Sequence, residues 1–169
     1  AESADEIFDR LTEVSLFTPL TDEQTRSLAE GAEAKIFASG EKIIRRGQDA
    51  GSMFVIHRGS VRVQINEDGH VKILRTLSEG EFFGEMGLFT GEPRTATVVA
   101  QEETEVLEIR HQSLKPILEE NPELVERFGD IIEERRAKLT EVSASQETDP
   151  KAGKAGMFES IRKFFGLKS

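Results

Sequence analysis

The stretch VRVQINEDGHVKILRTL, residues 61–77, decides the fold class. Apolar and polar residues alternate through VRVQI, which is the period-two pattern of a half-buried β-strand. A second apolar run, VKILRTL, follows after NEDG, in which Asp68 and Gly69 suit the positive φ angles of a tight hairpin turn. The stretch therefore predicts an antiparallel β-hairpin.

The same strand-and-turn pattern extends on both sides of this hairpin. From residue 34 to about residue 110, short apolar runs alternate with turns, and seven of these turns carry a glycine: Gly40, Gly47, Gly51, Gly59, Gly69, Gly80 and Gly91. About eight short antiparallel strands are typical of a closed roll or barrel. We therefore expect a jelly-roll-like antiparallel β-roll.

Both ends of the chain are predicted to be helical. SADE at 3–6 and TDEQ at 21–24 have the capping-box form, so residues 1–32 should be a helical segment. Asn121 and Pro122 supply an N-cap and a first-turn proline for a long helix that ends near 142. The fold class is therefore α+β.

The last part of the chain divides into a linker and a tail. Residues 143–156 have almost nothing to bury and are predicted to be a flexible linker. Residues 157–169 form a basic amphipathic helix, whose apolar face could dock on the domain itself, on a membrane surface or on a partner. These two interpretations of the tail, self-docking and external contact, remain open at this point.

Composition excludes several classes of protein. The formal charge of -10 argues against a nucleic-acid-binding body, and the absence of cysteine excludes disulfides and thiolate metal sites. The three histidines lack metal-ligand spacing, and no P-loop or nucleophile-elbow motif is present, so we expect neither a metal nor an enzyme. No apolar run is long enough to span a bilayer, and a cytoplasmic location is expected.

The segment FFGEMGLFTGEPRTATV, residues 82–98, carries the chemistry. Its first glycines let the backbone approach a ligand, and the free amides of the helical turn that follows would attract an anion. Arg94 can hold two oxygens of a phosphate, and the Thr95 hydroxyl can donate to a phosphate oxygen or a base edge. Glu85 would repel a phosphate, so its natural partner is a donor such as a ribose 2′-hydroxyl. Together these groups describe a site for a ribonucleotide.

This segment resembles the phosphate-binding cassette of the cyclic-nucleotide-binding domain family, and the resemblance covers roughly residues 15–142. It implies a domain at 33–142 in which a short cassette helix and a C-terminal lid helix flank the β-roll. It also implies a role for each ligand-binding residue. Backbone amides at Gly84 and Met86 and the side chains of Glu85, Arg94 and Thr95 would hold the ligand; Val71, Leu74 and Phe82 would line its apolar side; and Arg135 or Ile132 of the lid would lie near the base.

The resemblance further implies that the ligand is cAMP or cGMP, with cAMP slightly favoured. Because the chain begins with Ala1, we expect a piece of a longer protein in which this domain regulates an attached effector. A single cassette behind N-terminal helices favours a bacterial cyclic-nucleotide-regulated ion channel, with the domain on the cytosolic face of the membrane. The regulatory part of a cyclic-nucleotide-dependent kinase or of a transcription regulator is the alternative. A homo-oligomeric assembly is also left open.

Overall fold

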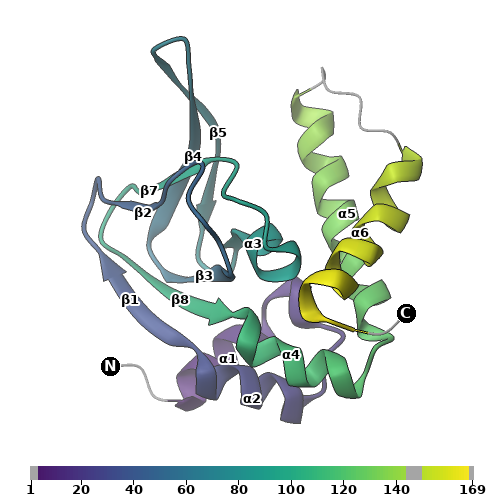
Figure 1. Ribbon diagram of the computed structural model, residues 1–169. Helices are drawn as coiled ribbons and strands as arrows, with labels where there is room; N and C mark the ends of the chain where they lie inside the picture. Colours follow the sequence, from purple (N-terminus) through teal and green to yellow (C-terminus); the bar gives the residue numbers. More distant parts are fainter. Residues whose placement is uncertain (1–3, 144–149, 168–169) are drawn as a thin grey trace.

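The computed structural model describes residues 4–143 and 150–167. Two four-stranded antiparallel sheets form a roll, and helices gather along one side of it (Figure 1). One sheet has the order β1-β8-β3-β6 and the other β2-β7-β4-β5. The strands are β1 (Glu33–Phe37), β2 (Lys42–Ile44), β3 (Ser52–Arg58), β4 (Ser60–Glu67), β5 (His70–Ser78), β6 (Phe82–Phe83), β7 (Thr97–Ala100) and β8 (Thr104–Arg110). The predicted eight-stranded antiparallel roll is confirmed.

Strands β4 and β5 form the hairpin predicted from residues 61–77. Its register runs from Ser60 opposite Ser78 to Glu67 opposite His70, which leaves a two-residue turn. Asp68 and Gly69 both have positive φ, 53° and 81°, as a turn that follows the twist of the strands requires. A register shift leaves Leu74 as the extra residue of a β-bulge. The hairpin stands out from the body of the domain (Figure 1).

Strand β3 is buried on both faces of its sheet. Phe54 and Ile56 point into the roll, where the Phe54 and Phe83 rings stack with centroids 5.3 Å apart. Met53 and Val55, at the alternate positions, belong to a second apolar cluster that the helices complete. Because both faces are covered, β3 is buried at five consecutive residues and its side chains are almost continuously apolar.

Helices precede and follow the roll, and one short helix, α3, lies between β6 and β7. They are α1 (Ala4–Thr12), the 3₁₀ turn η1 (Ser15–Phe17), α2 (Asp22–Gly31), α3 (Glu85–Thr90), α4 (His111–Glu120), α5 (Leu124–Ser143) and α6 (Pro150–Phe165). The capping box predicted at the start of α2 is present, because Thr21 accepts from the Gln24 amide and Gln24 accepts from the Thr21 amide. Ser3, which would cap α1, lies outside the described residues. No helix in the described part of the chain is long and apolar enough to span a membrane.

Two predicted helix boundaries differ from the structure. The long helix begins at Leu124, and the Asn121 side chain donates to the Ile117 carbonyl at the end of α4 instead of capping α5. The tail helix begins at Pro150, so the last seven residues of the predicted linker are helical, while residues 144–149 lie outside the described residues. Proline is favoured in a first helical turn, and the alanines and lysines that follow favour helix once a docked face stabilises it.

Candidate functional site

Residues 82–98, called the cassette here, cross from β6 through α3 to β7. Gly84 caps α3 in the left-handed conformation, with φ 77° and ψ 14°. A Cβ at Gly84 would lie 2.8 Å from Nη1 of Arg94, and one at Gly87 would lie 2.6 Å from the same atom. The glycines of the cassette therefore make room for the Arg94 guanidinium beneath the start of α3. Gly84 also adopts the positive φ that the chain requires at the N-cap of α3.

Arg94 is buried, with 8% of its surface exposed. Its Nη1 donates to the carbonyl oxygens of Ser52, at 2.8 Å, and Gly84, at 3.0 Å, while Nη2 donates to the Ser52 hydroxyl at 3.2 Å. Its Nε is buried and has no hydrogen-bond partner among the described residues. A guanidinium has five N–H donors, and Nε shares one edge of the fork with Nη2. The protein thus fixes Arg94 by one edge and leaves the other edge with donor capacity for a ligand.

A buried carboxylate, Glu108 of β8, supports Arg94 from behind. Glu108 accepts from the Ser52 hydroxyl at 2.7 Å and forms ion pairs with Lys35 at 2.6 Å and Arg110 at 3.2 Å. Burial would raise the pKa of Glu108, but the hydrogen bonds from Lys35 and Ser52 and the nearby positive charges lower it below its ordinary value. Glu108 is therefore ionised at neutral pH, and the Ser52 hydroxyl links its carboxylate to the Arg94 guanidinium.

The charge of Arg94 persists despite its burial. Burial lowers the pKa of Arg94 from its usual high value, and the negative charges of Glu108 and Glu85 oppose that effect. An arginine remains protonated in either case at neutral pH. The cassette therefore holds a fixed positive charge with a partnerless donor, which is suited to an anion with more than one oxygen.

Glu85 does not stand free in this structure. Arg135 of α5 forms an ion pair with it, Nη1 to Oε1 at 3.2 Å, and both side chains are mostly buried. Arg135 also donates to the Phe82 carbonyl, and its guanidinium lies 3.9 Å from the centroid of the Phe82 ring. Burial lowers the pKa of Arg135, and the Glu85 charge counteracts this. One arginine thus joins the long helix to two parts of the cassette, β6 and the start of α3.

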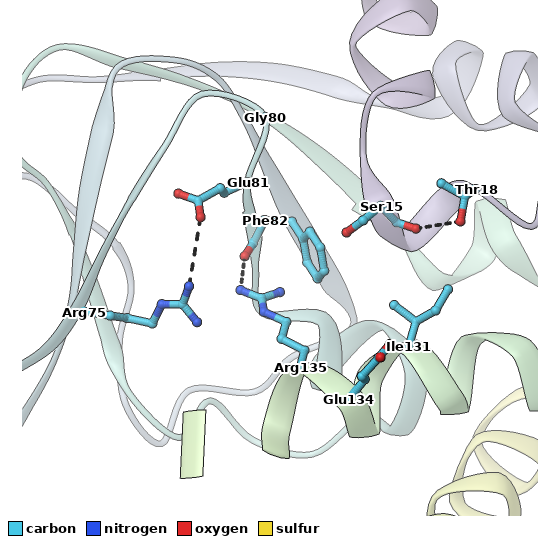
Figure 2. Close-up of a pocket in the computed structure, with 9 residues that line it drawn as sticks. All are labelled: Ser15, Thr18, Arg75, Gly80, Glu81, Phe82, Ile131, Glu134 and Arg135. Carbon is cyan, nitrogen blue, oxygen red and sulfur yellow. Dashed lines mark hydrogen bonds and ion pairs between the residues drawn. The ribbon is translucent and has the colours of Figure 1, made fainter. Parts of the chain in front are cut away.

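Figure 2 shows the contact of Arg135 with Phe82 in an adjoining cavity of about 450 Å³. Arg135 points at the Phe82 carbonyl, and Arg75 of β5 points toward Glu81, with 4.0 Å between Nη2 and Oε1. The remaining lining comes from η1 and the residue that follows it, from Gly80 in the turn between β5 and β6, and from α5. The lining residues are Ser15, Thr18, Arg75, Gly80, Glu81, Phe82, Ile131, Glu134 and Arg135.

The structure brings together the core of the predicted site. Gly84, Glu85, Met86, Arg94 and Thr95 lie within one continuous segment; the Gly84 carbonyl accepts from the Arg94 guanidinium, the Glu85 charge acts on it, and the Thr95 side chain is exposed. Met86 is half-buried and packs against the core.

The other predicted residues lie outside the cassette core. Val71 and Leu74 are on the protruding hairpin, 59% and 44% exposed. Phe82 is buried beneath Arg135, which is in contact with the site through Glu85. Of the two lid residues considered for the base, Ile132 is buried in the core and Arg135 faces the cassette.

Sequence reasoning did not find Ser52 and Glu108. The strand TEVLEIR, residues 104–110, carried a usable signal, because alternation places Glu108 on the same inward face as Val106. In the described residues, no group of three histidine, aspartate or glutamate side chains could hold a metal ion.

The family follows from these features and from sequence comparison. The chain belongs to the cyclic nucleotide-binding domain family, whose model matches residues 34–121, more than half of the sequence. It is therefore a regulatory domain of the kind also present in certain kinases and transcription regulators.

Three proteins with similar sequences illustrate this relationship. The chain is 33% identical over 141 residues to the cGMP-dependent protein kinase egl-4 of Caenorhabditis briggsae, covering 82% of this chain and 19% of that protein. It is 35% identical over 106 residues to the cAMP-activated global transcriptional regulator CRP of Salmonella typhimurium, covering 62% and 50%. A solved cyclic nucleotide-binding-like protein from Brucella abortus is 35% identical, with a TM-score of 0.61 over 68% of this chain and 98% of that one. The chain thus spans about a fifth of the kinase and half of the regulator.

Proposed function

We propose that this domain binds a 3′,5′-cyclic nucleotide at the cassette and transmits binding through α5 to an attached effector. The observation that carries the proposal is the buried, partnerless Nε of Arg94, on a guanidinium that is otherwise held by Ser52 and Gly84. A buried donor without a partner is costly unless a ligand completes it. A cyclic phosphate offers two exocyclic oxygens and one negative charge, which match the Nε and Nη2 edge of the fork.

The other cassette residues complete the nucleotide. The backbone amides near Gly84 and Met86 open α3 and would approach the phosphate, while Glu85 would accept from the ribose 2′-hydroxyl. Thr95, exposed next to Arg94, would donate to the phosphate or to the base. On the hairpin, Val71 and Leu74 expose apolar surface that a base could cover.

The lid part of the proposal rests on Arg135. It is the α5 residue that reaches Glu85, so the position of α5 and the state of the ribose acceptor are linked by one ion pair. A ligand shifts such an equilibrium only by its differential affinity for the two positions. A micromolar ligand has about 8 kcal/mol of total affinity, within which a shift of a few kcal/mol fits.

We propose cAMP as the slightly preferred ligand, with cGMP as its competitor. The related proteins include a cGMP-dependent kinase and a cAMP-activated regulator, so both nucleotides belong in the test.

For the effector we propose a bacterial ion channel with this domain on the cytosolic face. Because kinase and transcription-regulator relatives match this chain, a regulatory part of either class is the second candidate. We propose no catalytic step for this domain.

The direct test is calorimetric titration of the chain with cAMP, with cGMP and with linear 5′-AMP. We expect saturable binding of a cyclic nucleotide at micromolar concentration or below, and much weaker binding of 5′-AMP, whose dianionic phosphate does not match a site with one arginine. Absence of heat with both cyclic nucleotides, in a protein whose circular dichroism shows it folded, would refute the proposed function.

A further inference from the structure

The tail helix α6 docks on the domain by its apolar face. Ile161 and Phe165 are 0% and 1% exposed and belong to the same apolar cluster as the helix-facing side of β3. The contacts of α6 are mainly with α3 and α5, and the helix lies alongside both (Figure 1, yellow). Of the two interpretations of the tail, the structure supports self-docking.

Two glycines shape the groove that receives α6. A Cβ at Gly91, the C-cap of α3, would lie less than 3.0 Å from the ring of Phe164. A Cβ at Gly129, in the middle of α5, would likewise overlap the ring of Phe158. Each glycine is therefore a notch that one phenylalanine of α6 fills. The groove accepts a helix with aromatic side chains six residues apart, and α6 provides them.

The third wall of the groove is the start of α4. The His111 ring lies 4.8 Å from the Phe164 ring and 6.1 Å from the Phe165 ring, centroid to centroid. The two phenylalanines also contact each other edge to face, at 5.5 Å. Toward α5, Arg162 of α6 lies 3.9 Å from the Glu126 carboxylate. This set of contacts fixes α6 in one orientation between the cassette helix and α5.

The position of α6 matters because the helix contacts both the cassette helix α3 and the long helix α5. Phe164 holds the cassette side at Gly91, and Phe158 holds the α5 side at Gly129. If α5 moves relative to the cassette, at least one of the two notches must open. Because packed interfaces exist in discrete arrangements and resist continuous deformation, a docked α6 stabilises the arrangement seen here.

We propose that α6 is an intramolecular brace that opposes the movement of α5 relative to the cassette. In the arrangement that the brace stabilises, Arg135 of α5 pairs with Glu85, the proposed ribose acceptor, so the brace weakens nucleotide binding. This inference rests on the proposed function, in which nucleotide binding moves α5. By thermodynamic linkage, release of α6 strengthens nucleotide binding by the same factor by which nucleotide promotes release of α6. Coupling of this kind commonly amounts to about tenfold in affinity.

The sharpest test is Gly129→Ala in the full chain. In a helix interior alanine is ordinarily more favourable than glycine, so this substitution would stabilise α5 if the new Cβ did not overlap the Phe158 ring. Here the new Cβ displaces the Phe158 ring, and the amides of residues 158–165 should exchange hydrogen faster than in the wild type. Phe164→Ala opens the other notch, and Lys163→Ala, on the exposed face of α6, is the matched control.

Titration of the same proteins with cAMP and cGMP completes the test. We expect Gly129→Ala and Phe164→Ala to bind about tenfold more tightly than the wild type, and Lys163→Ala to bind like it. The brace is refuted if neither notch variant exchanges faster over 158–165, or if exchange is faster while the affinity is unchanged or reduced. Wild-type and variant proteins that all fail to bind would instead refute the proposed function, together with the inference that rests on it.

Discussion

Replacing Arg94 with alanine should reduce cyclic-nucleotide affinity more than any other single change in the cassette. The free edge of the guanidinium can make two charge-assisted hydrogen bonds to phosphate, each worth roughly 1.5 to 3 kcal/mol. Truncation of one partner in a buried, hydrogen-bonded charge pair costs about 2 to 5 kcal/mol. The structure therefore predicts a loss of about 3 to 5 kcal/mol, which is roughly a hundredfold to several thousandfold in Kd.

The assay is calorimetric titration, with the fold checked by circular dichroism because Arg94 also bonds Ser52 and Gly84. Arg46→Ala removes an equal charge from an exposed position and should leave Kd nearly unchanged. Arg94→Lys keeps the charge but loses the planar fork, so its affinity should fall between those of the wild type and the alanine variant. A folded Arg94→Ala protein that binds with wild-type affinity would refute the assignment of phosphate to this arginine.

Three further predictions concern other parts of the domain. Glu85→Ala should weaken cAMP binding about tenfold to a hundredfold but should barely affect 2′-deoxy-cAMP, because the lost acceptor pairs with the 2′-hydroxyl; equal losses for both ligands in the four titrations would argue against that pairing. Because the pKa of Glu108 is lowered in the fold, its carboxylate stabilises the protein above the ordinary value of about 4.3, and this contribution is lost as the pH falls through the folded value. The difference in free energy of unfolding between the wild type and Glu108→Gln, measured with urea, should therefore shrink from pH 6 to pH 3; a constant difference would contradict the ion-pair account. Thr21→Ala should lower the free energy of unfolding by about 1 kcal/mol through loss of the capping box, while Thr21→Ser retains it; equal stability of the two variants would show that the cap does not contribute.

Local chemistry made much of the fold predictable. The turn at Asp68 and Gly69 needs residues that tolerate positive φ, and Thr21 with Gln24 satisfies the first amides of α2 within four residues. Such features depend on neighbours in the chain, so a sequence pattern is enough to locate them. The cassette segment could be located for the same reason, because its candidate residues are contiguous in the sequence.

Contacts between distant segments were not predictable in the same way. Glu108 reaches Arg94 through Ser52, a residue 56 positions away, and Arg135 meets Glu85 only because α5 packs against the cassette. The start of α6 was missed because its glycine and lysine content suggests a linker, whereas docking of its apolar face stabilises the helix. In each case tertiary packing determines a feature for which the local sequence shows only a weak signal.

The central claim is that a cyclic nucleotide binds at the cassette of this domain. The most direct measurement is amide hydrogen exchange of the full chain with and without saturating cAMP, repeated with cGMP. The account predicts slower exchange over residues 84–96, which include Arg94, while exposed turns such as that at Asp68 and Gly69 remain fast. Unchanged exchange across the cassette, or protection confined to another part of the chain, would contradict it.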